Sequence, residues 1–340
     1  MLKVGIIGAR GFAGEELIEI LIQHSSVRLT YLADRLKKAT DISEIFPYLK
    51  GLTDLKCENF SIEKAIQKCD LVFLALPHTV SMDVVPKFVK KGKKIVDLSA
   101  DYRLKNVHVY KEWYHKAHKD KGNLKKFVYG LPELYRERIK KTDFVANPGC
   151  YPTAAILSIV PILISGLADP EGIIIDAKSG VTGAGKKATW DFSFGEVNEN
   201  FKGYKFNVHQ HSPEINQELS KVSSSRIHVV FCPHLLPLNR GIFETIYIKL
   251  NKPVDAGKIE NIYKKFYKTE PFVRVRGLGK FPELKNVVGT NFCDIGLVYD
   301  PGKMLLIVTS VIDNLLKGAS GQAVQNMNIM CGFDEKEALL

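Results

Sequence analysis

Cysteines are few in this sequence and lie far apart. Its 340 residues contain six, at positions 57, 69, 150, 232, 293 and 331, and no two of them form a CxxC pair. A disulfide framework is typical of short secreted chains, and a structural zinc site needs closely spaced cysteine pairs. We therefore expect six reduced thiols and no metal site.

A hydrophobic run long enough to cross a bilayer is also missing. The longest nearly apolar run, Ala154 to Ala168, contains Pro161 and is shorter than the ~20 residues that a transmembrane helix needs. Near the N-terminus, Arg10 and Glu15 come too early to leave room for the hydrophobic region of a signal peptide. We expect a cytoplasmic protein with no membrane partner.

Motifs for nucleic-acid binding are absent, although the chain is basic. It has 48 lysines and arginines against 37 aspartates and glutamates, a net charge of +11. The lysines are scattered, and none accompanies an RRM, KH or zinc-finger motif. Solvated helix surfaces and anionic small ligands explain the charge better, so we expect no nucleic-acid partner.

The sequence does contain the pattern of a two-domain α/β protein. Its length and its 45% hydrophobic residues suit about two globular domains. In the first half, short apolar runs alternate with segments of helical spacing, which predicts a doubly wound parallel sheet of the Rossmann type. The expected strands are 2–7, 27–33, 71–76, 94–98 and 144–146, with helices at 15–24 and 81–90.

After Cys150 the pattern changes to strands with few helices between them. This predicts an α+β domain with a largely antiparallel sheet, in which the DPG turn at 300–302 joins the last two strands. We assign 1–148, completed by 313–340, to the first domain and 149–312 to the second. The expected elements are a helix at 152–164, strands at 172–179, 226–232, 244–250, 272–276, 293–300 and 304–312, and a helix at 314–330.

Glycines at positions 8, 11 and 14 form a GxxGxxG turn between the first strand and the first helix. Glycines let a diphosphate approach the backbone, and the helix N-terminus offers free N–H groups, so this turn predicts dinucleotide binding. The next strand ends in Asp34-Arg35. An acidic residue there favours NAD and an arginine favours NADP, so the residues alone leave the choice open.

Cys150 stands in the segment NPGCYPT, between a predicted strand and a predicted helix. A helix N-terminus stabilises a thiolate, which makes this cysteine a candidate nucleophile rather than a buried structural thiol. His209, His211 and Glu214 lie together on one predicted turn, and either histidine is a candidate base for the thiol. Nothing else in the chain completes a metal site around the HxH pair.

Three further features predict anion binding. The turn SGVTGAGKK at 179–187 combines glycines with two lysines, and such turns can form a nest of N–H groups for an anion. Arg103 and Arg240 each lie next to a predicted strand, where arginines commonly hold anionic substrates, although either one can equally be a surface residue.

Taken in order, these segments resemble one family, the N-acetyl-gamma-glutamyl-phosphate reductases. The resemblance extends over nearly the whole chain, and the NPGCYPT and HxHxPEI elements are its most specific parts. It rests on GARGFAG (8–14), FLALPHTVS (73–81), VDLSADYRL (96–104), YGLPELYRE (129–137), ANPGCYPTA (146–154), KSGVTGAGKKA (178–188), VHQHSPEI (208–215), PHLLPLNRGI (233–242) and DNLLKGASGQAVQNMN (313–328).

The resemblance implies an NADP-binding Rossmann domain and a catalytic domain of the kind found in semialdehyde dehydrogenases and glyceraldehyde-3-phosphate dehydrogenase. It implies NADPH-dependent reduction of an acyl phosphate through a thioester on Cys150, with His209 as acid/base, in arginine biosynthesis. It implies a homodimer or homotetramer with a small-molecule acyl-phosphate substrate. The cofactor residues would be Gly8, Ala9, Arg10, Gly11, Phe12, Ala13, Gly14, Arg35, Pro77, Ser179, Gly180 and Asn314, and the substrate residues Arg103, Asn147, Gly183, Lys186, His211, Glu214 and Arg240.

Two positions depart from the family pattern. Asp34 stands where relatives often have serine, and Gln210 stands where arginine is commoner. A carboxylate near the 2′-phosphate of NADP opposes binding, so Asp34 is expected to weaken the preference for NADP. The alternatives are the reductase of carrier-linked aminoadipyl phosphate in lysine synthesis, aspartate-semialdehyde dehydrogenase, and a redox sensor that uses Cys150 as a reactive thiol.

Overall fold

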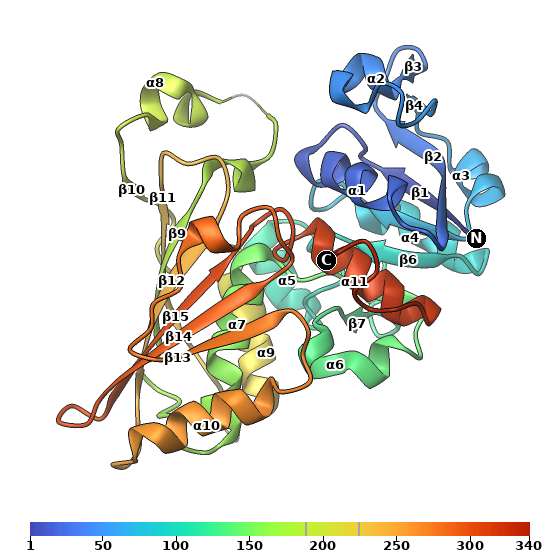
Figure 1. The fold of residues 1–340 in the computed structure, drawn as a ribbon. Helices are drawn as coiled ribbons and strands as arrows, with labels where there is room; N and C mark the ends of the chain where they lie inside the picture. Colours follow the sequence, from blue (N-terminus) through green and yellow to red (C-terminus); the bar gives the residue numbers. More distant parts are fainter. Residues whose placement is uncertain (188, 224) are drawn as a thin grey trace. The chain divides into compact units, whose positions relative to one another are not determined.

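The computed structural model describes residues 1–187, 189–223 and 225–340 (Figure 1). These residues form two compact units: the first unit is 1–148 with 319–340, and the second unit is 149–318. Ala188, the last residue of the KSGVTGAGKKA segment, lies outside the described residues. Within the described ranges, no helix is both long enough and apolar enough to cross a membrane.

The first unit is built on an eight-stranded sheet in the order β3-β4-β2-β1-β5-β6-β8-β7, in which every neighbouring pair is parallel except β3 and β4. The predicted Rossmann-type sheet is therefore confirmed. Its strands are β1 (Leu2–Ile7), β2 (Val27–Asp34), β3 (Thr40–Asp41), β4 (Lys56–Asn59), β5 (Leu71–Leu74), β6 (Lys94–Asp97), β7 (Val128–Tyr129) and β8 (Phe144–Ala146), and its main helices are α1 (Phe12–Ile22), α3 (Ile62–Lys68), α4 (Ser81–Lys90), α5 (Val107–Tyr114), α6 (Pro132–Ile139) and α11 (Ser320–Cys331).

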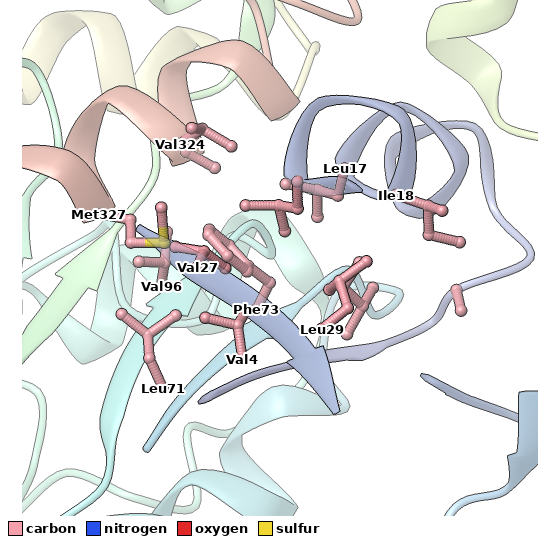
Figure 2. Packing of buried hydrophobic residues seen from close by; sticks show 14 of the residues in the cluster. Val4, Leu17, Ile18, Val27, Leu29, Leu71, Phe73, Val96, Val324 and Met327 are labelled. Atoms are coloured by element: carbon pink, nitrogen blue, oxygen red, sulfur yellow. The ribbon is translucent and has the colours of Figure 1, made fainter. Parts of the chain in front are cut away.

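Both faces of this sheet are buried, which explains why its strands are apolar at successive positions. Side chains alternate along a strand, so Leu71 and Phe73 enter one core cluster while Val72 and Leu74 enter the other. Figure 2 shows the first cluster, where Val324 of α11 packs over the same face as α1. The last helix of the chain thus completes the core of the first unit.

The last helix begins later than the sequence predicted. It was expected from residue 314 and is observed from Ser320, and residues 313–318 belong to the second unit. Asp313 is the reason, because its carboxylate accepts the N–H groups of Leu315 (2.8 Å) and Leu316 (3.2 Å) and its carbonyl accepts that of Gly318 (2.9 Å). These local bonds fold the segment into turns instead of a helix.

The second unit has a seven-stranded mixed sheet in the order β10-β11-β9-β12-β15-β14-β13. Four neighbouring pairs are antiparallel, while β11 with β9 and β13 with β14 are parallel. The α+β class is confirmed, although the strand expected at 226–232 lies at 230–235 and helix α10 was not predicted. The elements are α7 (Cys150–Ile164), β9 (Ile174–Ser179), α8 (Phe194–Val197), β10 (Lys202–Gly203), α9 (Ser212–Val222), β11 (Val230–Leu235), β12 (Ile242–Lys249), α10 (Ala256–Phe266), β13 (Val273–Leu278), β14 (Cys293–Asp300) and β15 (Leu305–Ile312).

Helix α7, which begins with Cys150, is buried along nearly its whole length. Pro161 lies inside it and has no N–H, so the carbonyl of Leu157 loses its usual intrahelical donor. The hydroxyl of Tyr267 donates to that carbonyl, and Tyr263 of α10 donates to the carbonyl of Ser158 at 2.6 Å. Tyr263 and Tyr267 thus donate to two carbonyls of α7 in the turn before Pro161 and tie the end of α10 to this helix.

A buried carboxyl lies under the same helix. Glu244 of β12 is opposite Ser310 of β15, and Ser310 donates to the carbonyl of Ala154 in α7 at 3.2 Å. Opposite residues share a face, so Glu244 points toward α7. Its side chain is fully buried, and neither carboxyl oxygen has a hydrogen-bond partner among the described residues. Burial raises the pKa of Glu244 well above its ordinary value.

This carboxyl should make the protein less stable as pH rises. A raised folded-state pKa means that the folded chain binds more protons than the unfolded chain above pH ~4.3, so stability falls from there toward the raised pKa. Glu244→Gln should remove this slope and raise the free energy of unfolding at pH 8 by about 1–2 kcal/mol. Urea unfolding of the wild type and of Glu244→Gln at pH 5 and pH 8 checks this. If the two proteins differ in free energy of unfolding by the same amount at both pH values, the prediction is wrong.

Candidate active site

The glycine turn of the first unit has the close packing that a dinucleotide cradle requires. A Cβ on Gly14 would lie 2.3 Å from the carbonyl oxygen of Gly8, and one on Gly8 would lie 2.2 Å from the carbonyl oxygen of Ala75. Gly8 also has φ +94°, a conformation that disfavours other residues. The turn leads into α1, with Gly11 before it and Phe12 as its first residue, so backbone N–H groups lie at the surface where a diphosphate can approach.

The other predicted cofactor residues of this unit lie at the carboxyl ends of neighbouring strands. Arg10 follows β1, Arg35 follows β2, and Pro77 follows β5, and all three are exposed. In an open α/β sheet this edge, where the strand order reverses around β1, is where ligands bind. Ala9 in the turn is buried, and Ala13, the second residue of α1, is half-buried. The residues present therefore fit a dinucleotide.

Arg103 is not the surface residue that the sequence left open as the alternative to a substrate contact. It is buried, and its Nε donates to the carbonyl of Asn147 (2.7 Å) while Nη2 donates to that of Leu98 (2.7 Å). The side chain of Asn147 in turn donates to the carbonyl of Ala319 and accepts from Asn326, each at 3.0 Å. These contacts hold the backbone that leads toward Cys150.

The VDLSADYRL segment also contains two buried carboxyl groups, those of Asp97 and Asp101. Asp97 accepts from the hydroxyls of Ser81 and Ser99, each at 2.8 Å. Burial and the neighbouring Asp101 raise the pKa of Asp97 to about 7. The segment is therefore a buried polar network that supports the strand ends.

Cys150 is the first residue of α7 and is half-buried. The N–H of the preceding Gly149 donates to Glu214 Oε1 at 2.8 Å, and the hydroxyl of Thr153 donates to the carbonyl of Gly149 at 2.9 Å. Gly318 packs against the cysteine so closely that a Cβ there would lie 2.8 Å from the Cβ of Cys150. The backbone of the nucleophile candidate is thus fixed from two sides.

Glu214 brings this cysteine together with the histidine pair in the second unit. It is buried in the first turn of α9, and His211 is the residue before that helix. The rings of His209 and His211 lie 5.6 Å and 5.9 Å from the ring of Tyr151, the residue after Cys150. Glu214 therefore holds the backbone of Gly149, the residue before Cys150, and the substrate contact that the resemblance implied stays a prediction.

The hydrogen bond at His209 defines which of its nitrogens carries the proton. The backbone N–H of His211 donates to Nδ1 of His209 at 3.1 Å. An accepting Nδ1 holds no proton, so the neutral ring carries its proton on Nε2. In this form His209 offers a donor at Nε2, which suits stabilising negative charge on an oxygen better than removing a proton from the thiol.

Two tyrosines that the sequence motifs do not mark as functional complete this cluster. The hydroxyls of Tyr151 and Tyr204 lie 3.0 Å apart, and Tyr204 also packs on His209 at 5.7 Å between rings. Burial raises the pKa of Tyr204 to about 12 and also raises that of Tyr151, so both hydroxyls stay protonated. The position of Tyr151 after Cys150 is a signal that could have found it, whereas nothing in the spacing marks Tyr204.

The glycine-rich turn after β9 pairs with the loop before β12. The N–H groups of Gly180, Val181 and Thr182 donate to the carbonyls of residues 241, 238 and 239. These three N–H groups are therefore used inside the protein and do not form the expected anion nest. Gly183 and Lys186, further along the turn, are exposed, while Ser179 at the end of β9 is buried.

Arg240 and Asn314 hold this region together. Arg240 pairs with the buried Asp313 through Nε (3.0 Å) and Nη2 (3.2 Å). The amide of Asn314 accepts from the Gly241 N–H (2.7 Å) and donates to the Thr182 hydroxyl (2.9 Å). Both side chains thus fix the loops beside Gly180, and the pairing offsets part of the positive charge of Arg240.

Comparisons with known proteins agree with this architecture. Residues 3–142 match the semialdehyde dehydrogenase, NAD binding domain, and residues 150–314 match the semialdehyde dehydrogenase, dimerisation domain. Aspartate semialdehyde dehydrogenase II from Vibrio cholerae has a TM-score of 0.73 at 18% identity, covering 98% of this chain and 99% of that one. The enzyme from Candida albicans, solved with NADP, has a TM-score of 0.71 at 14% identity, covering 97% and 98%. At these identities the likeness shows the fold.

Curated relatives are far more similar in sequence. An N-acetyl-gamma-glutamyl-phosphate reductase from Desulfotalea psychrophila is 50% identical over 340 residues, covering 100% of this chain and 98% of the relative. One from Thermoanaerobacter pseudethanolicus is 48% identical over 339 residues with the same coverage. The resemblance found in the motifs is confirmed, and the chain belongs to the N-acetyl-gamma-glutamyl-phosphate reductase family.

Proposed function

We propose that this protein reduces N-acetyl-L-glutamyl 5-phosphate to N-acetyl-L-glutamate 5-semialdehyde and phosphate, with NADPH as reductant, in arginine biosynthesis. The observation that carries the proposal is Cys150 at the first residue of α7, with the backbone of the preceding Gly149 held by Glu214 and the histidine pair packed on Tyr151. The names of relatives that match over the full chain support the substrate.

The cofactor would be held by the glycine turn and by the arginines at the carboxyl ends of β1 and β2. Gly8 and Gly14 allow the close packing of the turn that leads into the N-terminus of α1, where the diphosphate would bind, and Arg10 and Arg35 carry the positive charge that a 2′-phosphate needs. Bound NADPH supplies the hydride that reduces the acyl group. The NADP-bound structure of the Candida albicans protein supports this choice of cofactor.

Cys150 performs the covalent step. Its thiolate, favoured by the N-terminus of a 15-residue helix, attacks the acyl carbon, and the bond to phosphate breaks with release of inorganic phosphate. The acyl group then remains on sulfur as a thioester. After reduction, the C–S bond breaks, the aldehyde leaves and the thiolate returns. Covalent catalysis divides the reduction into two easier steps.

His209 assists at the oxygen of the reacting carbonyl. Its Nε2–H, fixed by the bond from the His211 N–H to Nδ1, can donate to the negative oxygen that develops when sulfur attacks and again when the thioester is reduced. Lys186 and Arg240 supply positive charge for the phosphate and carboxylate groups of the substrate. We assign Arg103 a supporting role, since its guanidinium is buried on backbone carbonyls.

The second unit also supplies a surface for self-association, and we propose a homodimer or homotetramer. The sheet face that points away from α7 carries Ile174, Tyr247 and Ile307 side by side in register, none of them fully buried. The match of residues 150–314 to a dimerisation domain supports this use of the face. Tyr247→Lys should shift sedimentation toward the monomer, whereas an unchanged sedimentation coefficient would count against this face.

The reaction run in reverse tests the enzyme proposal. NADP⁺ or NAD⁺, phosphate and a panel of semialdehydes derived from N-acetylglutamate, aminoadipate and aspartate are compared by kcat/KM. We expect phosphate-dependent reduction of NADP⁺ with the N-acetylglutamate derivative to be fastest. A higher kcat/KM for one of the other two assigns the corresponding alternative reductase, and no turnover with any of them leaves only the redox-sensor alternative.

A further inference from the structure

The carboxylate of Asp34, the last residue of β2, is directed at the protein backbone. Its Oδ2 accepts the N–H of Arg10 at 2.9 Å, and its Oδ1 accepts its neighbouring N–H, that of Arg35, at 2.7 Å. The carbonyl of Ala33 accepts from Gly8 (2.8 Å) and Ala9 (3.1 Å). Three hydrogen bonds therefore join the glycine turn to residues 33 and 34, and the bond from the Arg35 N–H fixes the other oxygen of the same carboxylate.

These contacts determine where two arginines lie. Arg10 and Arg35 are exposed, and Nη1 of Arg10 donates to the carbonyl of Arg35 at 3.5 Å, so the two residues are neighbours at the carboxyl ends of β1 and β2. Lys37 and Lys38, also exposed, follow after Leu36. The carboxylate fixes the backbone on both sides of this basic group, and its charge is partly offset by the N–H groups it accepts.

We propose that Asp34 is a positioning residue that favours a dinucleotide with a 2′-phosphate, by holding Arg10 and Arg35 where both guanidinium groups can reach that phosphate. The proposal rests on the proposed function, in which NADPH is the reductant. It reverses the expectation from sequence, which treated Asp34 as a charge that repels the phosphate. The two expectations differ because a carboxylate that accepts the N–H groups of Arg10 and Arg35 fixes their backbone. Its removal would leave both arginines without this support.

The test measures binding of two redox-inactive probes by titration calorimetry. Adenosine 2′,5′-bisphosphate carries the 2′-phosphate, and adenosine 5′-monophosphate lacks it. We expect Asp34→Ser to weaken binding of the bisphosphate about tenfold and of the monophosphate less than about threefold. Asp34→Asn, which keeps one acceptor oxygen, should lie between the wild type and Asp34→Ser. Asp54→Ser, which removes an exposed carboxylate elsewhere in the same unit, should bind both probes like the wild type.

The possible outcomes distinguish a wrong role for Asp34 from a wrong choice of NADPH as the cofactor. Equal affinity of the wild type for the two probes would show that the NADP preference itself is wrong. A wild-type preference for the bisphosphate that is unchanged or increased in Asp34→Ser would overturn only the role of Asp34. An equal loss for both probes, with a lowered melting temperature, would also overturn it, because Asp34 would then merely stabilise the fold.

Discussion

Replacing Cys150 with alanine should abolish semialdehyde formation, with a loss of at least roughly 10⁴-fold in kcat, because no other group can carry the thioester. Binding of NADPH, measured by its fluorescence, should change less than about twofold, since the glycine turn belongs to the first unit and the cysteine to the second. Incubation of the wild type with the acyl phosphate, without reductant, should add the mass of the acyl group to the peptide that contains Cys150.

Cys232 provides the matched control for this experiment. It lies on β11 in the same unit and is likewise half-buried, but its side chain points to the opposite face of the strand from that of Phe231, which packs on His209. Cys232→Ala should retain wild-type kcat and should still be acylated at Cys150. Turnover of Cys150→Ala within tenfold of the wild type would assign the nucleophile to another residue.

Much of the fold could be predicted because its signals are local. The strands of the first unit are continuous apolar runs, since each sends alternate residues into one of two cores, as Val72 and Phe73 do. The NPGC segment contains its own strand and helix signals, so the position of Cys150 at a helix N-terminus follows from a few adjacent residues. The late start of α11 was missed because the bonds to Asp313 competed with the helical spacing of the apolar residues after it.

The contacts that give the candidate site residues their roles could not be predicted, because they join residues far apart in the chain. Asp34 meets the N–H of Arg10 across 24 positions, and Arg240 meets Asp313 across 73. A sequence shows that such a residue is charged, but its role depends on whether its partner is a ligand or the protein itself. For this reason the sequence predicted that Asp34 opposes NADP binding, whereas its backbone contacts indicate that it favours it. For the same reason the sequence could not show that Arg103 is buried.

Replacing His209, whose neutral ring carries its proton on Nε2, should have the second large effect on turnover. His209→Ala should lower kcat about 10²–10³-fold, the usual loss when one donor to a developing oxyanion is removed. Glutamine can place an amide N–H near the position of the histidine Nε2, so His209→Gln should recover part of this loss if His209 acts as a donor. His211→Asn should cost less, because its backbone N–H, which holds His209, is unchanged.

Alkylation separates this donor role from that of a base. If His209 stabilises an oxyanion, Cys150 of His209→Ala should still react with iodoacetamide near the wild-type rate at pH 7, since the thiolate then depends on the helix N-terminus and not on the imidazole. If His209 is instead the base for the thiol, alkylation should fall together with turnover, and His209→Gln should be as inactive as His209→Ala. The bond from His211 to Nδ1 favours the first result, because an imidazolium would point an Nδ1 proton at that same backbone N–H.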